Sequence, residues 1–301
     1  MPSILIIGLG ELGTAILTAL QSHPHRRTSP LAILRRDTAP SATNTPLLAA
    51  GITLEKGDFI TCPLPALIAT FQKYTVVIQA AGMGLPPGTQ LRVTTAVLAA
   101  GVPRYFPWQF GLDYRAIGAG SSQDLFDEML AVRERLAGQG ATEWTVVSAG
   151  LFMSFLFVPG FGVVDLKEKV VRGLGGWERR VTVTTPEDIA RVLAELVYAP
   201  ADERVVYVAG DTVSYRRVAD LVEGAYGGGF RRELWDMETL KGQLERSPDD
   251  GMVKYRNVFG AGVGTAWDVE RTVNYERKMS MTSLEAYLGE HKDRMEEEAK
   301  G

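Results

Sequence analysis

Three glycines near the N-terminus have the spacing of a loop that binds phosphate. Gly8, Gly10 and Gly13 form a G-x-G-x-x-G pattern directly after the apolar run Ile4–Ile7. The first glycine of this pattern allows a tight turn, the second lets the backbone approach a pyrophosphate, and the third lets a helix pack close to the sheet. The N–H groups at the start of that helix then face the anion. We therefore expect a dinucleotide to bind at Gly8, Gly10, Glu11, Leu12 and Gly13.

Two adjacent arginines indicate which dinucleotide is bound. Arg35 and Arg36 follow the apolar run Leu31–Leu34 and precede Asp37. An acid at this position accepts a hydrogen bond from the ribose 2′-OH of NAD, whereas a guanidinium binds the 2′-phosphate of NADP. Because a charge-assisted phosphate contact outweighs one aspartate, we predict NADP(H). The alternative is that both arginines are solvated and that Asp37 binds the ribose of NAD.

Short apolar strands that alternate with helices must position these residues. Strands are predicted at Ile4–Ile7, Leu31–Leu34, Val76–Ile78, Arg104–Phe106 and Trp144–Val147. Apolar residues at helical spacing predict helices over Leu12–Leu20, Val93–Leu98 and Leu125–Leu136. This order is typical of βαβ units, so we predict an α/β fold with a doubly wound, parallel Rossmann sheet.

The alternation of strands and helices stops near Gly150. We expect an NADP-binding Rossmann domain over residues 1–150, which also receives 181–209, and a smaller substrate-binding lobe over 151–301, interleaved with it. Thr185 and Pro186 are typical of a helix start. Residues Val205–Val208 are expected to add a strand to the first sheet, and Glu290–Lys300 to form a solvated helical tail.

Composition excludes several classes of function. The 301 residues carry 32 basic and 36 acidic side chains, a net charge of -4, which is too even for a nucleic-acid-binding surface. The single cysteine, Cys62, cannot form an internal disulfide, which is typical of a cytoplasmic protein. The three histidines are His23 and His25, in a loop after the first helix, and His291 near the C-terminus, so we expect neither a metal site nor a Ser-His-Asp triad.

One uncharged stretch has about the length that a bilayer requires. It runs over residues 144–164, but it opens with a strand pattern and contains Gly150, Pro159 and Gly160. Those residues would leave backbone groups unsatisfied in lipid. We therefore predict the wall of an apolar pocket rather than a membrane span, and the N-terminus has no signal-peptide pattern.

Taken together, these motifs resemble those of the isoflavone reductase-like and NmrA-like branch of the atypical short-chain dehydrogenases. The resemblance covers most of the chain. It rests on the glycine loop, Arg35, Glu55–Asp58, Val76–Gly82, Thr185–Ile189 and Asp211–Ser214. Its most specific part is Arg104–Gly111, which looks like the family's F-x-P-S-x-F-G segment, while Trp108, Gln109 and the later Gln123–Asp127 look most like fungal members.

The resemblance implies a longer cofactor site and a type of reaction. It extends the expected cofactor contacts to Gln79, Ala80, Ala81, Gly82, Pro107, Trp108, Gln109 and Phe110. It also implies hydride transfer from NADPH to a small aromatic, enone-type or alkaloid-like compound of secondary metabolism. Uncharged aromatic walls suit such a ligand. We expect its pocket to include Trp108, Met129, Phe152 and Phe155.

One catalytic residue that the resemblance implies is missing. In the reductases a lysine lies four residues before an arginine that matches Arg133, and that position holds Met129. A thioether cannot donate a proton, and a positioned general acid contributes about two to four decades of rate. Donors expected beside the nicotinamide are Asp113, Tyr114, Asp124 and Asp127, with Tyr255 and Lys254 from the second lobe.

Three functions are therefore open. The first is an NADPH-dependent reductase of a small aromatic metabolite. The second is an enzyme that keeps the NADP pocket but catalyses a cyclisation, isomerisation or dehydration. This hypothesis is favoured because Met129 stands where the reductases have a lysine. The third is a non-catalytic sensor, similar to the NmrA regulators, in which a bound dinucleotide changes the affinity for a protein partner.

Overall fold

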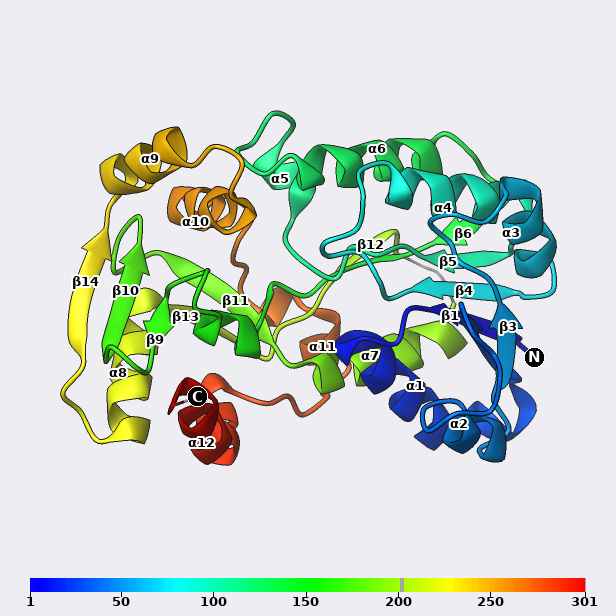
Figure 1. The fold of residues 1–301 in the computed structure, drawn as a ribbon, viewed down its shortest axis with the longest axis horizontal. Coiled ribbons are helices and arrows are strands. Elements are labelled where there is room, and N and C mark those ends of the chain that lie inside the picture. The colour runs from blue at the N-terminus through cyan, green and yellow to red at the C-terminus, as the bar shows by residue number, and fades with distance from the viewer. Residues whose placement is uncertain (201–202, 301) are drawn as a thin grey trace. The chain divides into compact units, whose positions relative to one another are not determined.

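The structure, a computed structural model, describes residues 1–200 and 203–300 and divides into two compact units (Figure 1). The first unit combines Met1–Gln109, Glu128–Val147 and Ile189–Val206. The second combines Phe110–Asp127, Ser148–Asp188 and Tyr207–Gly301. Each unit is thus built from segments far apart in the sequence. The assignment of a dinucleotide domain to 1–150 with 181–209, and of a substrate lobe to 151–301, stays a prediction.

Six parallel strands form the sheet of the first unit, in the order β3-β2-β1-β4-β5-β6. The strands are β1 (Ile4–Ile7), β2 (Leu31–Arg35), β3 (Thr53–Lys56), β4 (Val76–Gln79), β5 (Arg104–Phe106) and β6 (Glu143–Trp144). Ile4 pairs in register with Leu31 on one side and Val76 on the other. All of β1 is fully buried, as a strand covered on both faces requires. The predicted doubly wound Rossmann fold is confirmed.

Helices lie on both faces of this sheet. Figure 1 shows α3, α4 and α6 on one face and α1, α2 and α7 on the other. Their bounds are α1 (Glu11–Ser22), α2 (Thr45–Ala49), α3 (Leu64–Phe71), α4 (Thr89–Ala99), α6 (Leu125–Ala137) and α7 (Pro186–Tyr198), with a 3-10 turn at Pro24–Thr28. Thr185 caps α7 as predicted, because its Oγ1 accepts a hydrogen bond of 3.2 Å from the Asp188 N–H.

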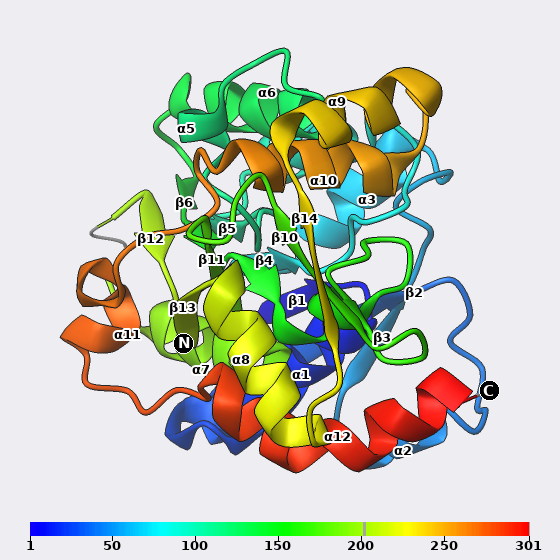
Figure 2. The same cartoon turned by 90° about the vertical axis from the view of Figure 1, so that its left-hand side faces the viewer.

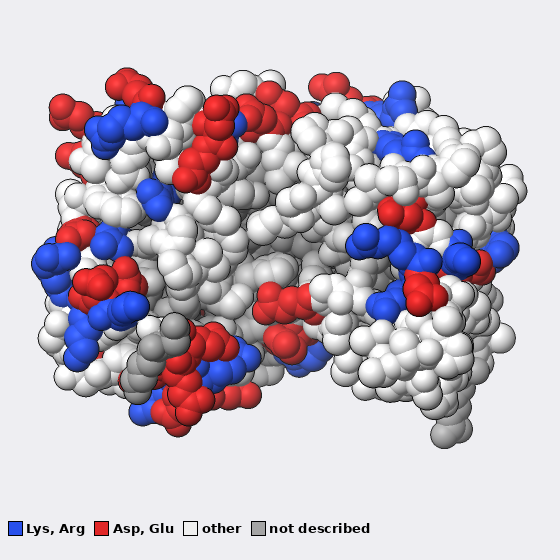
Figure 3. All heavy atoms as spheres, in the orientation of Figure 1, with Lys and Arg blue, Asp and Glu red and all other residues white. Residues whose placement is uncertain are grey.

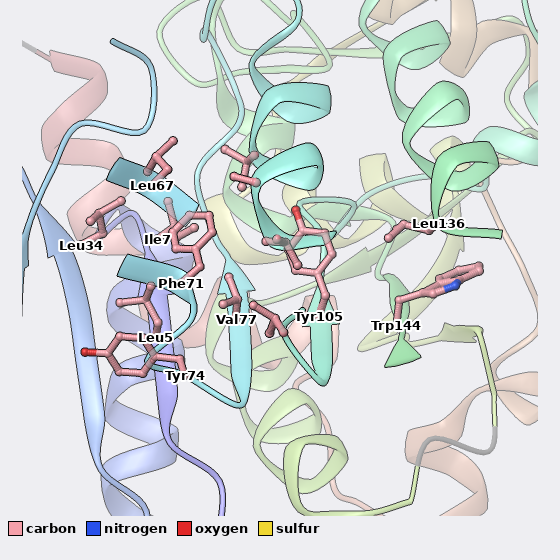
Figure 4. Close-up of a cluster of buried hydrophobic side chains, with 14 of the residues drawn as sticks. Leu5, Ile7, Leu34, Leu67, Phe71, Tyr74, Val77, Tyr105, Leu136 and Trp144 are labelled. Atoms are coloured by element: carbon pink, nitrogen blue, oxygen red, sulfur yellow. The ribbon is translucent and has the colours of Figure 1, made fainter. Parts of the chain in front are cut away.

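A hydrophobic core fills the space between the sheet and α3, α4 and α6. Leu5, Val77 and Tyr105 of the strands are fully buried in it (Figure 4). Phe71 of α3 and Leu136 of α6 close the same core. The apolar positions that repeat along each helix are the ones that contact the sheet, so the core fixes the carboxyl ends of the strands, where the candidate site begins.

The second unit contains two small sheets and most of the remaining helices. One sheet joins β14 (Arg231–Trp235), β10 (Val170–Leu174) and β9 (Val164–Asp165), and the other joins β13 (Asp211–Ser214), β11 (Arg180–Thr184) and β8 (Leu151–Phe152). The helices are α5 (Tyr114–Ile117), α8 (Tyr215–Tyr226), α9 (Met237–Arg246), α10 (Gly251–Ala261), α11 (Val273–Glu276) and α12 (Leu284–Lys300), with 3-10 turns at Met153–Phe157 and Val269–Arg271. Figure 2 shows α8 beside α12.

Two details of the predicted elements are wrong. The strand predicted over Trp144–Val147 breaks at Thr145 into β6 and β7 (Val146–Ser148). The strand predicted at Val205–Val208 forms β12 (Val205–Tyr207), but it pairs with β7 and not with the six-stranded sheet. The segment Glu290–Lys300, expected as a solvated helical tail, is the helical end of α12; of its described side chains Met295 is buried, where α12 packs on α8, and the others are exposed or half-buried.

Charges of both signs are interspersed on the face that Figure 3 shows. Lys and Arg side chains lie beside Asp and Glu on this face. Among the ion pairs of the structure are those of Arg232 with Asp220 and Glu223 and of Lys73 with Glu55. Acidic side chains gather most densely over α12. Binding to a nucleic-acid backbone would require a continuous basic surface. The face in Figure 3 does not have one.

Candidate functional site

The three glycines of the loop after β1 have different physical roles. Gly8 has a φ of +94°, and a Cβ there would lie 2.4 Å from the Cβ of Ala81. A Cβ at Gly13 would lie 2.0 Å from the Gly8 carbonyl oxygen. Gly10 has an ordinary φ of -76°, and a Cβ there would meet no atom within 4 Å. Gly8 and Gly13 are thus required by the fold itself, whereas the space beside Gly10 is open to a ligand.

Helix α1 begins at this loop without a side-chain cap. Gly10 is its N-cap residue, and its carbonyl accepts the first helical hydrogen bond, 2.9 Å from the Thr14 N–H. A helix start leaves N–H groups that a side chain or a ligand must satisfy. An N-terminus without a capping side chain, next to open space, fits the binding of a phosphate.

A cavity of about 460 Å³ lies within the first unit, beside this loop. Its lining comes from the carboxyl ends of β1, β2, β3 and β4, which is where open α/β sheets bind ligands. The lining residues are Gly8, Leu9, Gly10, Leu34, Arg35, Arg36, Asp37, Gly57, Asp58, Phe59, Ile60, Ala81 and Leu85. Among the predicted cofactor residues, it brings together Gly8, Gly10, Arg35, Arg36 and Ala81.

Two cations and one acid meet at the end of β2. Arg35 is half-buried and donates from Nη2 to Thr43 Oγ1 at 3.1 Å, while Arg36 is exposed. The Asp37 carboxylate accepts a 3.0 Å hydrogen bond from the Ala39 N–H, so one of its oxygens stabilises the turn from Asp37 to Ala39. A negatively charged group in the cavity would therefore meet two guanidinium groups and one acid that is already hydrogen-bonded.

The segment after β4 combines a buried amide with small residues. Gln79 is fully buried, donates to Gln90 Oε1 and accepts from the Tyr105 hydroxyl. Its side chain therefore serves the interior of the unit, not the cavity. Ala80 is 9% exposed, and a Cβ at Gly82 would overlap the indole of Trp108. Trp108 thus packs directly on the backbone of Gly82.

The segment after β5 is tied to helix α6. Gln109 is fully buried and donates from Nε2 to the Met129 carbonyl at 2.9 Å. Its Oε1 accepts a hydrogen bond from Arg133 Nε. Pro107 is buried in the same unit, and Phe110, the next predicted cofactor residue, belongs to the second unit and is 7% exposed. The Gln109 side chain therefore holds α6 in place through the backbone carbonyl of Met129 and the side chain of Arg133.

The three aspartates expected to donate a proton are all engaged by other groups. Asp113 caps α5 through the N–H groups of Arg115 and Ala116, and its second oxygen accepts a 2.7 Å bond from Tyr207. Asp127 accepts a 2.9 Å bond from the Gly120 N–H. Asp124 forms an ion pair with Lys254. Each contact is a structural role that competes with proton transfer.

Met129 lies in the core, fully buried on α6. The helix presents it on the same apolar stripe as Val132 and Leu136, which are also buried. A flexible thioether fills irregular spaces of this kind well. At this position the protein therefore has packing where the resemblance implies an acid.

Aromatic rings cluster in the second unit. Tyr114 is buried, and its ring lies 4.7 Å from that of Phe126. Tyr255 lies 5.7 Å from Phe126 and 6.0 Å from Phe155, in edge-to-face geometry. Burial raises the pKa of the Tyr255 hydroxyl well above its usual range, so this group keeps its proton at neutral pH. Phe152, also predicted for the pocket, is half-buried in β8 of the same unit.

Four cavity residues after β3 were not assigned to the site by sequence reasoning. Gly57 follows β3, and its N–H donates to the Arg35 carbonyl at 2.8 Å. Asp58, Phe59 and Ile60 form the next turn, in which the Asp58 carboxylate accepts from the Ile60 N–H at 2.9 Å. The signal was the stretch Glu55–Asp58, whose position at a strand end becomes clear only when β3 is placed beside β2.

Within residues 1–200 and 203–300, no group of three or more His, Cys, Asp or Glu side chains could hold a metal ion. In the same part of the chain, no helix is long and apolar enough to cross a membrane. The apolar stretch 144–164 is divided among β6, β7, β8, β9 and a 3-10 turn.

A Rossmann sheet with a glycine loop and a basic strand end defines a dinucleotide-binding class of fold. Within that class, the chain belongs to the NmrA-like family, whose model matches residues 2–288. The family resemblance seen in the sequence is thus confirmed.

Named relatives agree with this assignment, and a solved structure has the same fold. An NmrA-like family domain-containing oxidoreductase from Gibberella moniliformis is 50% identical over 296 residues, which are 95% of this chain and 97% of that protein. An isoflavone reductase homolog from Zea mays is 28% identical over 81% of both chains. The solved complex of leucoanthocyanidin reductase with NADPH from Vitis vinifera superposes with a TM-score of 0.76, at 17% identity, over 96% of this chain and 99% of that one.

Proposed function

We propose that this protein is an NADPH-dependent reductase of a small aromatic or alkaloid-like metabolite. The observation that carries the proposal is the cavity of about 460 Å³ in which the glycine loop and the Arg35–Arg36 pair meet. The names of the relatives support it, because the relative from Gibberella moniliformis is called an oxidoreductase and the Vitis vinifera structure contains NADPH.

The residues present fit this cofactor. Gly10 leaves open space at the uncapped start of α1, which suits a pyrophosphate. Arg35 and Arg36 suit a 2′-phosphate, since guanidinium groups bind phosphate through charge-assisted hydrogen bonds. When bound, NADPH supplies a hydride. The chain's own residues must then hold the acceptor and provide a proton.

The aromatic cluster of the second unit supports an aromatic substrate. Phe155 and Tyr255 are half-buried and meet edge to face, so part of each ring is open to another ring, whereas Phe126 is fully buried beside Tyr255. Within this cluster, Tyr255 is the proton donor that we propose in place of the missing lysine. Its hydroxyl carries a proton at neutral pH, and a substrate ring bound beside Phe155 would contact it. Because burial raises its pKa, this phenol is a weaker acid than an exposed tyrosine.

A second candidate is an enzyme that binds NADP(H) but catalyses no net redox reaction. Full burial of Met129 favours it, because the position that carries the family's acid has become part of the core. Such an enzyme would guide a cyclisation, isomerisation or dehydration by shape. The two candidates differ in one measurable quantity, the consumption of NADPH.

The first experiment is a titration of the purified protein with NADPH and NADH, followed by cofactor fluorescence. We expect NADPH to bind at least about tenfold more tightly, a difference of roughly 1.4 kcal/mol. Arg35→Ala and Arg36→Ala should remove that preference. Arg294→Ala, which changes an exposed arginine on α12, is the matched control and should leave it intact. Binding of neither nucleotide would contradict the proposal.

The second experiment measures NADPH consumption with a panel of aromatic enones. We expect turnover that falls by about two decades or more in Tyr255→Phe, the loss typical of a general acid. Wild-type protein that binds NADPH tightly but never consumes it would instead support the non-redox candidate or a sensor. Equal turnover in Tyr255→Phe would exclude the hydroxyl as the donor.

A further inference from the structure

The loop that follows Arg36 is tied together behind Arg35. Thr43 Oγ1 accepts the hydrogen bond from Arg35 Nη2 at 3.1 Å and lies 3.2 Å from Ser41 Oγ. Ser41 Oγ in turn accepts a 3.1 Å bond from the Asn44 N–H. A chain of hydrogen bonds therefore connects the guanidinium of Arg35 to the backbone at the start of α2.

Asn44 anchors this chain in the protein interior. It is 1% exposed, and its Nδ2 donates to the carbonyls of Asp37 at 2.9 Å and Ala39 at 2.8 Å. These two bonds fold the Asp37–Asn44 loop onto itself. We call Ser41, Thr43 and Asn44 the loop clip. Both amide hydrogens of Asn44 Nδ2 and its backbone N–H are used within the loop, so the clip favours this loop conformation.

Thr43 reaches Arg35 from outside the cavity. Arg35, Arg36 and Asp37 line the cavity, and Thr43 does not. A free arginine side chain has many rotamers, and part of this freedom is lost when the guanidinium binds a phosphate. A guanidinium that is already held at one nitrogen loses less freedom on binding, which raises affinity without any new contact to the ligand.

We propose that the loop clip positions Arg35 to bind the 2′-phosphate of NADP(H), so that Thr43 determines cofactor selectivity without touching the cofactor. This inference rests on the proposed NADP(H) function. It adds residues that the G-x-G-x-x-G pattern and the arginine pair do not include. Thr43 is a positioning residue, and its effect passes through Arg35.

The test compares Thr43→Val with wild type for binding of NADPH, NADH and adenosine 2′,5′-bisphosphate. Valine keeps the shape of threonine but removes the hydroxyl. We expect about tenfold weaker binding of NADPH and of the bisphosphate, with unchanged NADH binding and an unchanged melting temperature. Thr43→Ser, which restores the hydroxyl, should recover most of the affinity. Thr38→Val changes a threonine of the same loop that does not line the cavity and is the matched control.

A double-mutant cycle separates positioning from direct contact. If Thr43 acts through Arg35, Thr43→Val has no further effect on NADPH binding in the Arg35→Ala background. An equal loss in both backgrounds would overturn the inference, since Thr43 would then act independently of Arg35. Unchanged NADPH binding in Thr43→Val, or tighter binding because Thr43 competes for the guanidinium, would overturn it as well.

The wild-type titration keeps the two proposals distinguishable. Wild type that binds neither nucleotide, or prefers NADH, contradicts the proposed function before any variant is measured. Wild type that prefers NADPH, combined with unchanged selectivity in Thr43→Val, contradicts only the role of the clip. In activity assays, the expected change is in KM for NADPH with kcat unchanged, because Arg35 does not contact the reacting atoms.

Discussion

At the scale of single residues, the glycine loop separates the needs of the fold from those of a ligand. Gly13 packs against the Gly8 carbonyl, so any side chain there must displace backbone. The sequence pattern names all three glycines but does not show which of them a side chain would disturb. The difference depends on how close a Cβ at Gly8 would lie to Ala81, and a Cβ at Gly13 to the Gly8 carbonyl. These distances are defined only once the chain is folded.

We predict that Gly10→Ala weakens NADPH binding at least about tenfold while the protein stays folded. The new methyl group enters open space, so its cost to stability is at most about 1 kcal/mol, the loss expected when alanine replaces glycine as an N-cap. Gly13→Ala should instead destabilise the fold by about 1–3 kcal/mol through overpacking. Urea unfolding and the NADPH titration measure the two effects, with Gly140→Ala as the control. Wild-type affinity in Gly10→Ala would exclude a phosphate at this position.

At the scale of elements, the centre and the edge of the first sheet differ in how far the sequence predicts them. Strands β1 and β4 are short apolar runs, and their pattern alone gives their positions. Strand β3 (Thr53–Lys56) has no fully buried residue, because it is an edge strand, so hydrophobic pattern could not detect it. The cavity residues from Gly57 to Ile60 were missed for the same reason.

Helices α4 and α6 are joined by one carboxylate, and we predict that this contact matters for stability. Glu128 accepts hydrogen bonds from the N–H groups of Gly88 at 3.0 Å, Gln90 at 2.8 Å and Leu91 at 3.1 Å. It thus caps α4, whose N-cap glycine has no side chain. Glu128→Ala should lower the free energy of unfolding by about 1–3 kcal/mol in urea.

The control for this contact is Glu134→Ala, which removes an exposed carboxylate from the same helix. It should change stability by less than about 0.5 kcal/mol. Glu128→Gln should be intermediate, since the amide oxygen still accepts a hydrogen bond but lacks the charge that favours a helix N-terminus. Equal stability of Glu128→Ala and Glu134→Ala would show that α4 does not need this cap.

At the scale of the whole molecule, buried phenols should limit stability at alkaline pH. Burial raises the pKa of Tyr74, Tyr105, Tyr215, Tyr226 and Tyr255, which are found in both units. The unfolded chain releases these protons near pH 10, whereas the folded chain keeps them. Their contribution to stability is therefore fully present below pH 10 and is lost as pH rises through the folded-state pKa.

Tyr226 makes this prediction specific, because burial, with a smaller effect of nearby acids such as Glu296, raises its pKa to about 12. Between pH 10 and 12, stability should fall steeply, and phenolate absorbance should rise together with the loss of circular dichroism. Tyr226→Phe removes one of these phenols and should flatten the fall, whereas Tyr275→Phe, at an exposed ring, should not. Phenolate absorbance that reaches its full amplitude while the dichroism is still native would contradict the prediction, because tyrosines held in the two cores cannot ionise without opening them.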